Sequence, residues 1–244
     1  MLKLMLLAVG IIGFFPVFQS CSDDDGYSLG DYWLDVATVE TWEGNANYFR
    51  LDDGTTLWPA AGYYLGHNLR EGQRTWLNYT ILSDNKDGFD HYVKVNGVDT
   101  ILTKGISEDK GLENDSYYGT DPVKINNIWI GNGYLNVIFK FNYGGIKKHF
   151  INLLPVTVNQ NPYEVEFRHN AYNDPAEAGV ASIVCFDLAS LPDTEGKTVK
   201  LKVHVKTFDG DKTFELDYNT DKGAVLSKTP ANLSVDMNYF ETVN

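Results

Sequence analysis

The chain has 244 residues and carries 33 acidic against 20 basic side chains, a formal net charge of −13 at pH 7. Nucleic acids are bound by neutralising their phosphates with lysine and arginine, so we expect no nucleic-acid partner. A cationic peptide or a cationic patch on another protein is the favoured kind of partner. The only cysteines are Cys21 and Cys185, so no disulfide framework is expected and apolar burial must stabilise the fold.

Residues 1–20 have the pattern of a lipoprotein signal peptide. Lys3 precedes an apolar stretch from Leu4 to Phe18, and the small residue Ser20 stands directly before Cys21. A transmembrane anchor is the weaker alternative, because a spanning helix needs about 20 apolar residues. We therefore expect cleavage after Ser20 and acylation of Cys21. Removal of Lys3 with the signal peptide leaves a mature net charge of −14.

The acidic run that follows Cys21 resembles the surface-export signal of Bacteroidetes lipoproteins. It consists of Ser22, Asp23, Asp24 and Asp25. The resemblance implies a lipid-anchored protein of the outer membrane that is exposed at the cell surface. A soluble acidic spacer on a protein that faces the periplasm is the alternative. We interpret residues 21–30 as an acidic tether.

Short β-branched and aromatic runs between Gly, Asp and Asn turns indicate an all-β protein. The first strand candidates are 31–41, 47–51, 55–58, 74–82, 91–95 and 98–103. Asp52-Asp53-Gly54 and Asn96-Gly97 predict hairpin turns between neighbouring candidates. Five strands in roughly 80 residues favour a small OB-like barrel over residues 31–110, with an SH3-like barrel as the alternative.

Residues 107–122 are polar and turn-rich, and we interpret them as a linker, with a short helix over 107–114 as the alternative. Hairpins are predicted at Asn132-Gly133 and Asp209-Gly210-Asp211 in the remainder of the chain. Its short strands predict an antiparallel β-sandwich for residues 120–244. The strand candidates there are 125–131, 134–141, 147–154, 163–169, 179–187, 198–208, 212–217 and 232–237.

Five segments of the chain together form a pattern of known type: Cys21–Asp25, Leu51–Pro59, Phe167–Asp174, Phe186–Leu188 and Leu201–Phe208. In their order and spacing they resemble the NigD-like family of Bacteroidetes lipoproteins. The family implies an N-terminal OB-like domain and a C-terminal β-sandwich. Its name comes from a protein encoded beside a bacteriocin and proposed to give immunity. No catalytic residues are known for the family, so the resemblance transfers none.

The segment that leaves the third strand candidate is the most site-like part of the sequence. It contains Trp58, Tyr63 and Tyr64, and OB-folds bind ligands on this side, often by stacking on aromatic rings. An acidic barrel would favour a peptide or a sugar there. The alternative is that these three rings pack over a barrel end or against the sandwich.

No catalytic residue, metal site or cofactor is predicted. His169, Asp174 and Cys185 are residue types of a cysteine protease, but Cys185 lies in an apolar run and is expected to be a buried, inert thiol. The five histidines are scattered without metal-ligand spacing. Turn carboxylates such as Asp174 and Asp209 are expected to be solvated rather than to bind calcium.

The sequence therefore predicts a non-enzymatic, membrane-anchored envelope lipoprotein that binds a protein or peptide partner. Bacteriocin immunity is what the family resemblance implies. The alternative is a glycan-binding or envelope-assembly accessory lipoprotein. An enzyme is disfavoured because no set of polar residues points to a reaction.

Overall fold

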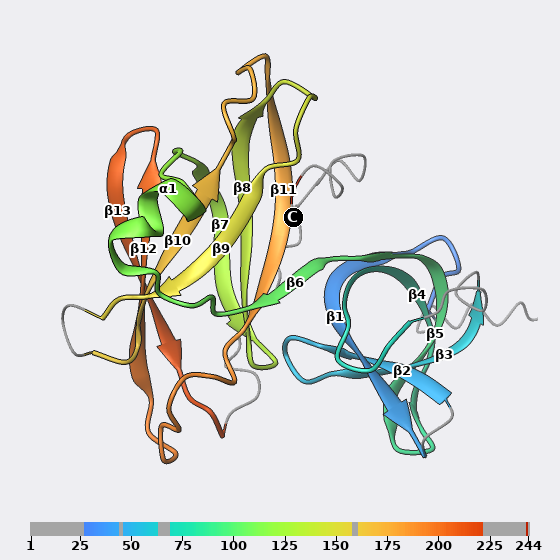
Figure 1. Ribbon diagram of the computed structural model, residues 1–244. Coiled ribbons are helices and arrows are strands. Elements are labelled where there is room, and N and C mark those ends of the chain that lie inside the picture. The colour runs from blue at the N-terminus through green and yellow to red at the C-terminus, as the bar shows by residue number, and fades with distance from the viewer. Residues whose placement is uncertain (1–26, 44–45, 63–68, 158–160, 222–242, 244) are drawn as a thin grey trace, which may run out of the picture.

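The structure, a computed structural model, describes residues 27–43, 46–62, 69–157, 161–221 and Val243. A barrel is followed along the chain by a sandwich of two sheets (Figure 1). No helix within the described ranges is long and apolar enough to cross a membrane. Cys21, the export residues Ser22–Asp25 and the strand candidate 232–237 lie outside the described residues.

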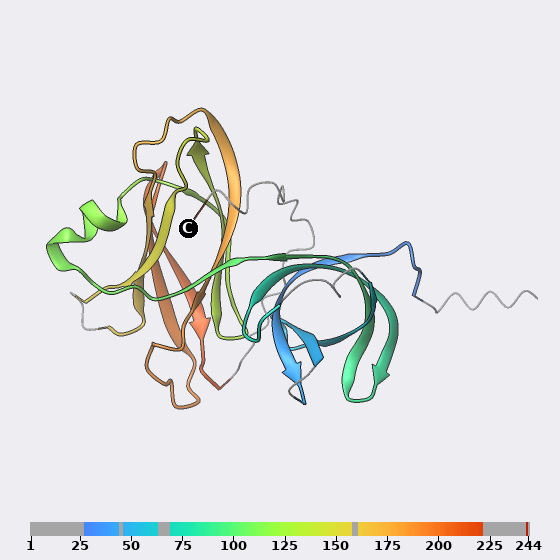
Figure 2. The ribbon, with the colours of Figure 1, turned by 45° about the vertical axis from the view of Figure 1, so that its right-hand side comes forward.

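Five strands form the closed barrel, in the order β1-β2-β3-β5-β4 with β4 returning to β1. Figure 2 shows it as a ring beside the sandwich. Only β3 and β5 run parallel, and alternating side chains such as Val39, Phe49 and Leu77 fill the interior. The OB-like barrel is thus confirmed. Its strands are β1 (Trp33–Trp42), β2 (Ala46–Leu51), β3 (Thr56–Gly62), β4 (Arg74–Lys86) and β5 (Phe89–Thr100).

The hairpin predicted at Asn96-Gly97 is wrong. β5 runs straight through this dipeptide, and Asn96 forms a bulge where the β4–β5 register shifts. The amide of Asn96 donates to the side chains of Asn78 at 3.1 Å and Thr80 at 3.0 Å. The chain turns instead at Asp87-Gly88, where φ is 52° and 90°. Asp-Gly supplies the two positive φ angles of a type I′ turn.

Two four-stranded sheets form the sandwich, in the orders β13-β12-β10-β9 and β6-β11-β8-β7. Most pairs are antiparallel, but β10 pairs parallel with β12 and β6 pairs parallel with β11. The predicted sandwich and its Asn132-Gly133 hairpin are confirmed. The strands are β6 (Leu102–Gly105), β7 (Lys124–Gly131), β8 (Tyr134–Tyr143), β9 (Phe150–Pro155), β10 (Glu164–Asn170), β11 (Ala178–Asp187), β12 (Val199–Thr207) and β13 (Gly210–Tyr218).

The segment interpreted as a linker contains short helical structure that begins inside the range 107–114 and continues to Tyr118. A 3₁₀ turn, η2 (Gly111–Glu113), leads into α1 (Asn114–Tyr118), which contacts β9 and β10. Buried Tyr118 anchors the segment by donating its hydroxyl to the Glu108 carbonyl at 2.7 Å.

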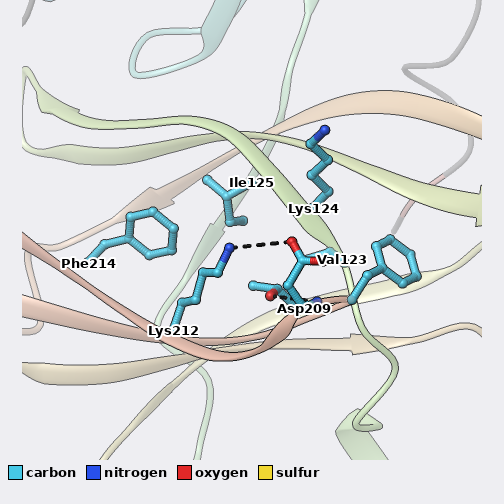
Figure 3. Close-up of a pocket in the computed structure, with 8 residues that line it drawn as sticks. Val123, Lys124, Ile125, Asp209, Lys212 and Phe214 are labelled. Atoms are coloured by element: carbon cyan, nitrogen blue, oxygen red, sulfur yellow. Dashed lines mark hydrogen bonds and ion pairs between the residues drawn. The ribbon is translucent and has the colours of Figure 1, made fainter.

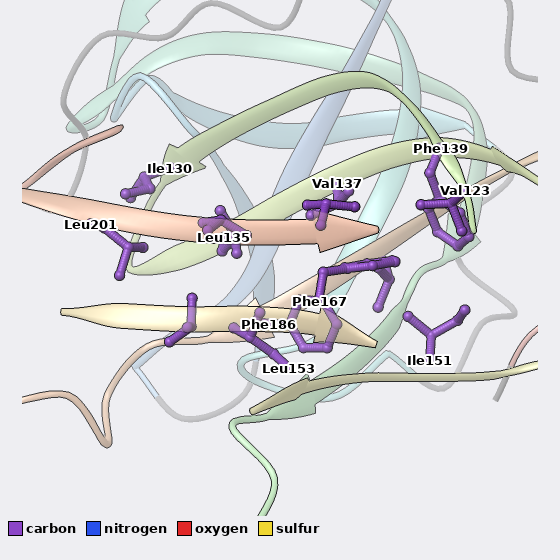
Figure 4. Packing of buried hydrophobic residues seen from close by; sticks show 14 of the residues in the cluster. Val123, Ile130, Leu135, Val137, Phe139, Ile151, Leu153, Phe167, Phe186 and Leu201 are labelled. Atoms are coloured by element: carbon purple, nitrogen blue, oxygen red, sulfur yellow. The ribbon is translucent and has the colours of Figure 1, made fainter. Parts of the chain in front are cut away.

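The sandwich core is apolar and rich in aromatic rings (Figure 4). Phe167 contacts Phe139 and Phe186 edge-to-face, with centroids 5.3 Å and 6.1 Å apart. Each fully buried ring of this kind contributes about 1.5–3 kcal/mol, and the edge-to-face geometry adds to that.

A second apolar cluster joins the barrel to the sandwich. Ile138, Ile183 and Cys185 alternate with core residues along β8 and β11, so their side chains leave the sandwich on its outer side. There they meet Val36, Trp76 and Ile101 of the barrel. Strand alternation therefore gives the sheet that contains β8 and β11 two buried faces. One face packs in the sandwich core, and the other packs on the barrel, so the two domains share a core.

A buried ion pair lies at the same interface. The Asp52 carboxylate accepts from Arg74 at 2.6 Å, from the indole of Trp129 at 2.8 Å and from the amide of Asn136 at 3.1 Å. Asp52 is 3% exposed and Arg74 is fully buried. Arg74 also donates to the Asn136 carbonyl oxygen at 2.8 Å. Asp52 was expected only to form a hairpin turn, but its carboxylate binds the sandwich.

Asp52→Ala should lower the free energy of unfolding by about 3–5 kcal/mol, because it leaves the Arg74 guanidinium buried without its counter-charge. Urea unfolding at pH 7.5 measures the loss. Asp53→Ala is the matched control, since Asp53 is exposed and accepts only from the Thr55 backbone. Equal, small losses in both variants would show that the buried pair contributes little.

Candidate functional site

Five aromatic side chains gather at one end of the barrel. We call this group the aromatic face, and it consists of Trp42, Tyr48, Trp58, Phe89 and Tyr92. The strand pairing assembles the group: Trp42 ends β1, Trp58 and Tyr92 are register partners, and Phe89 begins β5. The aromatic face lies on β3 and beside the β4–β5 turn. This is the side of the barrel on which OB-folds bind ligands.

Phe89 is the centre of the aromatic face. Its ring lies 4.9 Å from Trp58, 5.2 Å from Trp42 and 5.2 Å from Tyr48, measured between centroids. Phe89 is buried, whereas Trp42 is 44% exposed and Trp58 is half-buried. A buried ring thus supports two tryptophans that remain accessible to a ligand.

Three carboxylates of the β4–β5 hairpin accompany the aromatic face. Asp87 accepts from the Tyr92 hydroxyl at 2.8 Å, and Asp90 accepts from the Thr56 backbone and hydroxyl at 2.8 and 2.7 Å. Asp84 accepts from Tyr27 and lies 2.6 Å from the His91 ring. No lysine or arginine among the described side chains forms an ion pair with any of the three.

Hydrogen bonds favour the charged forms of Asp84 and Asp90. The pKa of Asp90 is lowered by the two donors of Thr56, and that of Asp84 by the Tyr27 hydroxyl and then by His91. Glu40 differs, because Arg50 neutralises it at 2.6 Å. Burial acts to raise the pKa of Glu40, but the bonds from Arg50 and Tyr48 outweigh it.

The chemistry of the aromatic face is that of a cation-binding surface. Tryptophan faces attract ammonium and guanidinium groups, and the carboxylates beside them add charge complementarity. Trp58, singled out from the sequence, lies at this surface. Tyr63 and Tyr64 lie outside the described residues. Sequence reasoning missed Phe89 and Trp42, which are remote from Trp58 along the chain.

A small hollow of about 210 Å³ opens between β7 and the β12–β13 hairpin (Figure 3). Val123, Ile125 and Phe214 line it, and Lys212 reaches across it to Asp209 at 3.6 Å. The two charges neutralise each other, so the hollow offers a ligand mainly apolar surface.

A wider hollow of about 460 Å³ lies on the outer face of the sheet that contains β12. His204 and Thr213 line it, with ring nitrogen and hydroxyl 2.9 Å apart, and the other ring nitrogen of His204 lies 2.6 Å from the buried Glu164, in the order of a catalytic triad. Thr213, however, is the direct register partner of His204 in regular β-structure. This is the geometry of a cross-strand polar pair rather than of an activated nucleophile on a turn.

The cysteine-protease residue types do not come together. The Cys185 side chain lies in the interdomain cluster on β11, whereas His169 lies on β10 of the other sheet. Burial raises the pKa of the Cys185 thiol to about 11. The thiol donates to the Asn136 carbonyl oxygen at 3.0 Å and is therefore a structural group.

His149 and His169 form a buried pair that the sequence did not predict, with ring nitrogens 2.8 Å apart. Asp174, expected to be a solvated turn residue, has a fully buried carboxylate. It accepts from the backbone of Gly144 at 2.5 Å and Lys147 at 3.1 Å, and lies 3.4 Å from His149. These partners replace water. The described residues contain no group of three or more metal-ligating side chains.

Acid should destabilise the protein through this pair. Burial, and then His149, lower the pKa of His169 to about 4, and burial lowers that of His149. The unfolded chain takes up protons near its ordinary pKa of 6.5, before the folded chain does. Stability should therefore fall between pH 6.5 and 4, by on the order of 2–3 kcal/mol for His169.

Urea unfolding at several pH values measures how steeply the free energy of unfolding falls with pH. The free energy of unfolding of His169→Gln should depend less on pH between 6.5 and 4 than that of wild type, although the variant should be less stable at pH 7.5. The control is His91→Gln, because His91 lies at the surface beside Asp84. If His169→Gln and wild type share one slope, the pair is not the source of the acid sensitivity.

The fold defines a two-domain all-β protein in which a barrel is packed on a sandwich. Two family models cover the same two parts: a NigD-like N-terminal OB domain matches residues 36–101, and a NigD-like C-terminal beta sandwich domain matches residues 105–218. The chain therefore belongs to the NigD-like family, as its sequence suggested. Among curated proteins, none is similar enough to count as a match.

Solved structures agree. A protein from Parabacteroides distasonis, provisionally described as toxin-related, is 49% identical with a TM-score of 0.74, over 79% of this chain and 96% of that one. A protein of unknown function from Bacteroides vulgatus is 25% identical (TM-score 0.68; 82% and 97% covered). A NigD-like immunity protein from Bacteroides caccae, 19% identical (TM-score 0.59; 77% and 97% covered), shares the fold.

Proposed function

We propose that this NigD-like protein is a non-enzymatic lipoprotein of the outer membrane, anchored through Cys21 and exposed at the cell surface. Its aromatic face binds a cationic peptide or a cationic segment of a protein. The observation that carries the proposal is the pairing of accessible Trp42 and Trp58 with hairpin carboxylates that form no ion pair with a lysine or arginine among the described residues. The net charge of −13 supports attraction of the same kind of partner.

The biological role proposed for this binding is immunity to a secreted bacteriocin. The Bacteroides caccae relative is described as a NigD-like immunity protein, and the Parabacteroides distasonis relative is provisionally described as toxin-related. A cationic bacteriocin captured at the surface would be held away from the membrane by an anchored binder. The carboxylates of Asp84 and Asp90 would pair with its lysine or arginine side chains.

Trp42→Ala should weaken binding of a synthetic peptide of alternating arginine and leucine by about threefold to thirtyfold, the contribution of a cation–π contact. Trp58→Ala should do the same. Fluorescence titration at 150 mM salt measures both affinities. Tyr32→Ala is the matched control, since Tyr32 is an exposed aromatic residue of the barrel outside the aromatic face. Equal affinity in all variants would place binding elsewhere, and equal binding of a glutamate–leucine peptide would exclude charge recognition.

In cells, deletion of the gene should increase sensitivity to cationic bacteriocins from neighbouring strains, and the wild-type gene should restore resistance. Cys21→Ala should release the protein from membranes, because a lipid chain contributes about 0.8 kcal/mol per buried CH₂, and should fail to restore resistance. Carbonate-washed membranes and growth assays measure the two effects. Membrane retention of the Cys21→Ala protein would contradict the lipid anchor, and unchanged sensitivity across a broad panel would contradict immunity.

A further inference from the structure

A second aromatic surface lies on the sandwich, away from the aromatic face of the barrel. Tyr117 of α1, Phe150 at the start of β9 and Tyr172 of the β10–β11 loop form it, and we call it the sandwich aromatic row. The Phe150 and Tyr172 rings are within 23° of parallel, with centroids 6.3 Å apart. Tyr117 stands at 76° to Phe150, 6.0 Å away. The Phe150 and Tyr172 rings are therefore stacked, and the Tyr117 ring stands edge-on to Phe150.

The row is accessible and held in place. Tyr117 is 51% exposed and Tyr172 is 40% exposed. Tyr172 has a φ of 52°, a left-handed conformation that is an outlier for a bulky side chain. Hydrogen bonds hold it there: its N–H donates to Asn170 at 2.9 Å, and its carbonyl accepts from Lys147 at 2.6 Å. Strain maintained in this way at the surface is typical of functional sites.

Two lysines bracket the row without a counter-charge. Lys104 lies 4.3 Å above the Phe150 ring, and its ammonium donates only to the Ile151 carbonyl and the Asn152 side chain. Lys147 donates to the Tyr172 carbonyl. In the described part of the chain neither forms an ion pair with a carboxylate. Burial lowers the pKa of Lys104 to about 8, a cost that a bound anion would remove.

We propose that the sandwich aromatic row is a binding site for an acidic polysaccharide, a sugar chain that carries carboxylates. The exposed rings of Tyr172 and Tyr117 suit the apolar faces of pyranose rings, and Phe150, which Lys104 covers, supports Tyr172 from below. Lys104 and Lys147 supply the positive charge for the carboxylates. The two carboxylates beside the row are held by backbone donors: Asp121 accepts from the Ala171 N–H at 2.7 Å, and Asp174 accepts from the Lys147 N–H at 3.1 Å. Charges beyond about 8 Å are screened at physiological salt.

This site goes beyond the proposed binding of a cationic partner and uses different residues. Phe208 offers a matched comparison, since it is a 48% exposed aromatic residue in the turn before β13. Tyr172→Gly offers a variant that should still fold, because glycine adopts positive φ without strain. It removes the exposed ring while relieving the backbone.

The experiment is titration of the mature protein with polygalacturonate, with dextran of matched length as the neutral probe, at 150 mM salt. Wild type should bind polygalacturonate saturably and dextran at least about fivefold more weakly. Tyr172→Gly and Lys147→Gln should each lose about fivefold or more in affinity, the scale of one ring contact or one charge-assisted bond. Phe208→Ala and the barrel variant Trp58→Ala should bind as wild type does.

Three results would each overturn the proposal: no saturable binding of polygalacturonate, equal binding of dextran, or full affinity in Tyr172→Gly. Melting temperatures of the variants show whether the loss is local. If Tyr172→Gly melts like wild type and binds weakly, the ring itself is the binding group. Loss of peptide binding in Trp58→Ala with polygalacturonate binding retained would show that the two surfaces act independently.

Discussion

The ion pair between Asp52 and Arg74 is the interaction on which the two-domain arrangement depends. Removing two charges from water is unfavourable, and such a pair is stable only where hydrogen bonds satisfy the remaining lone pairs. Trp129 and Asn136 of the sandwich supply those bonds to Asp52. The barrel carboxylate thus cannot be satisfied without the sandwich. The Asp52 carboxylate also explains why residue 131 is a glycine. A Cβ at Gly131 would lie 2.3 Å from the Asp52 carboxyl carbon.

Local signals in the sequence predict most of the strands, but not how the strands meet. Asn132-Gly133 forms the predicted hairpin, whereas Asn96-Gly97 lies inside one long strand as part of a bulge. The same dipeptide permits both outcomes, and the pairing of β5 with β3 and β4 decides between them. Asp52 shows a second limit: its turn position is a local property, while its partners on β4, β7 and β8 come from distant segments.

The candidate sites show the same difference between local sequence signals and contacts that only the fold creates. Trp58 is recognisable because an aromatic and glycine-containing segment surrounds it, but Phe89 becomes its neighbour only when β5 pairs with β3. His149 and His169 are 20 residues apart, and only the antiparallel pairing of β9 with β10 brings their rings together. Spacing rules for metal sites detect ligands on one element, so they miss pairs that are formed across strands.

Charge is the property that sequence reasoning treats most coarsely here. A net charge of −13 favours a cationic partner for the whole chain, yet a ligand senses only the charges within about one Debye length. Three carboxylates lie at the aromatic face of the barrel, whereas the ammonium groups of Lys104 and Lys147 lie beside the sandwich aromatic row. The two surfaces therefore differ in the sign of the ligand they suit. The interface at Asp52 joins the two domains that carry these surfaces.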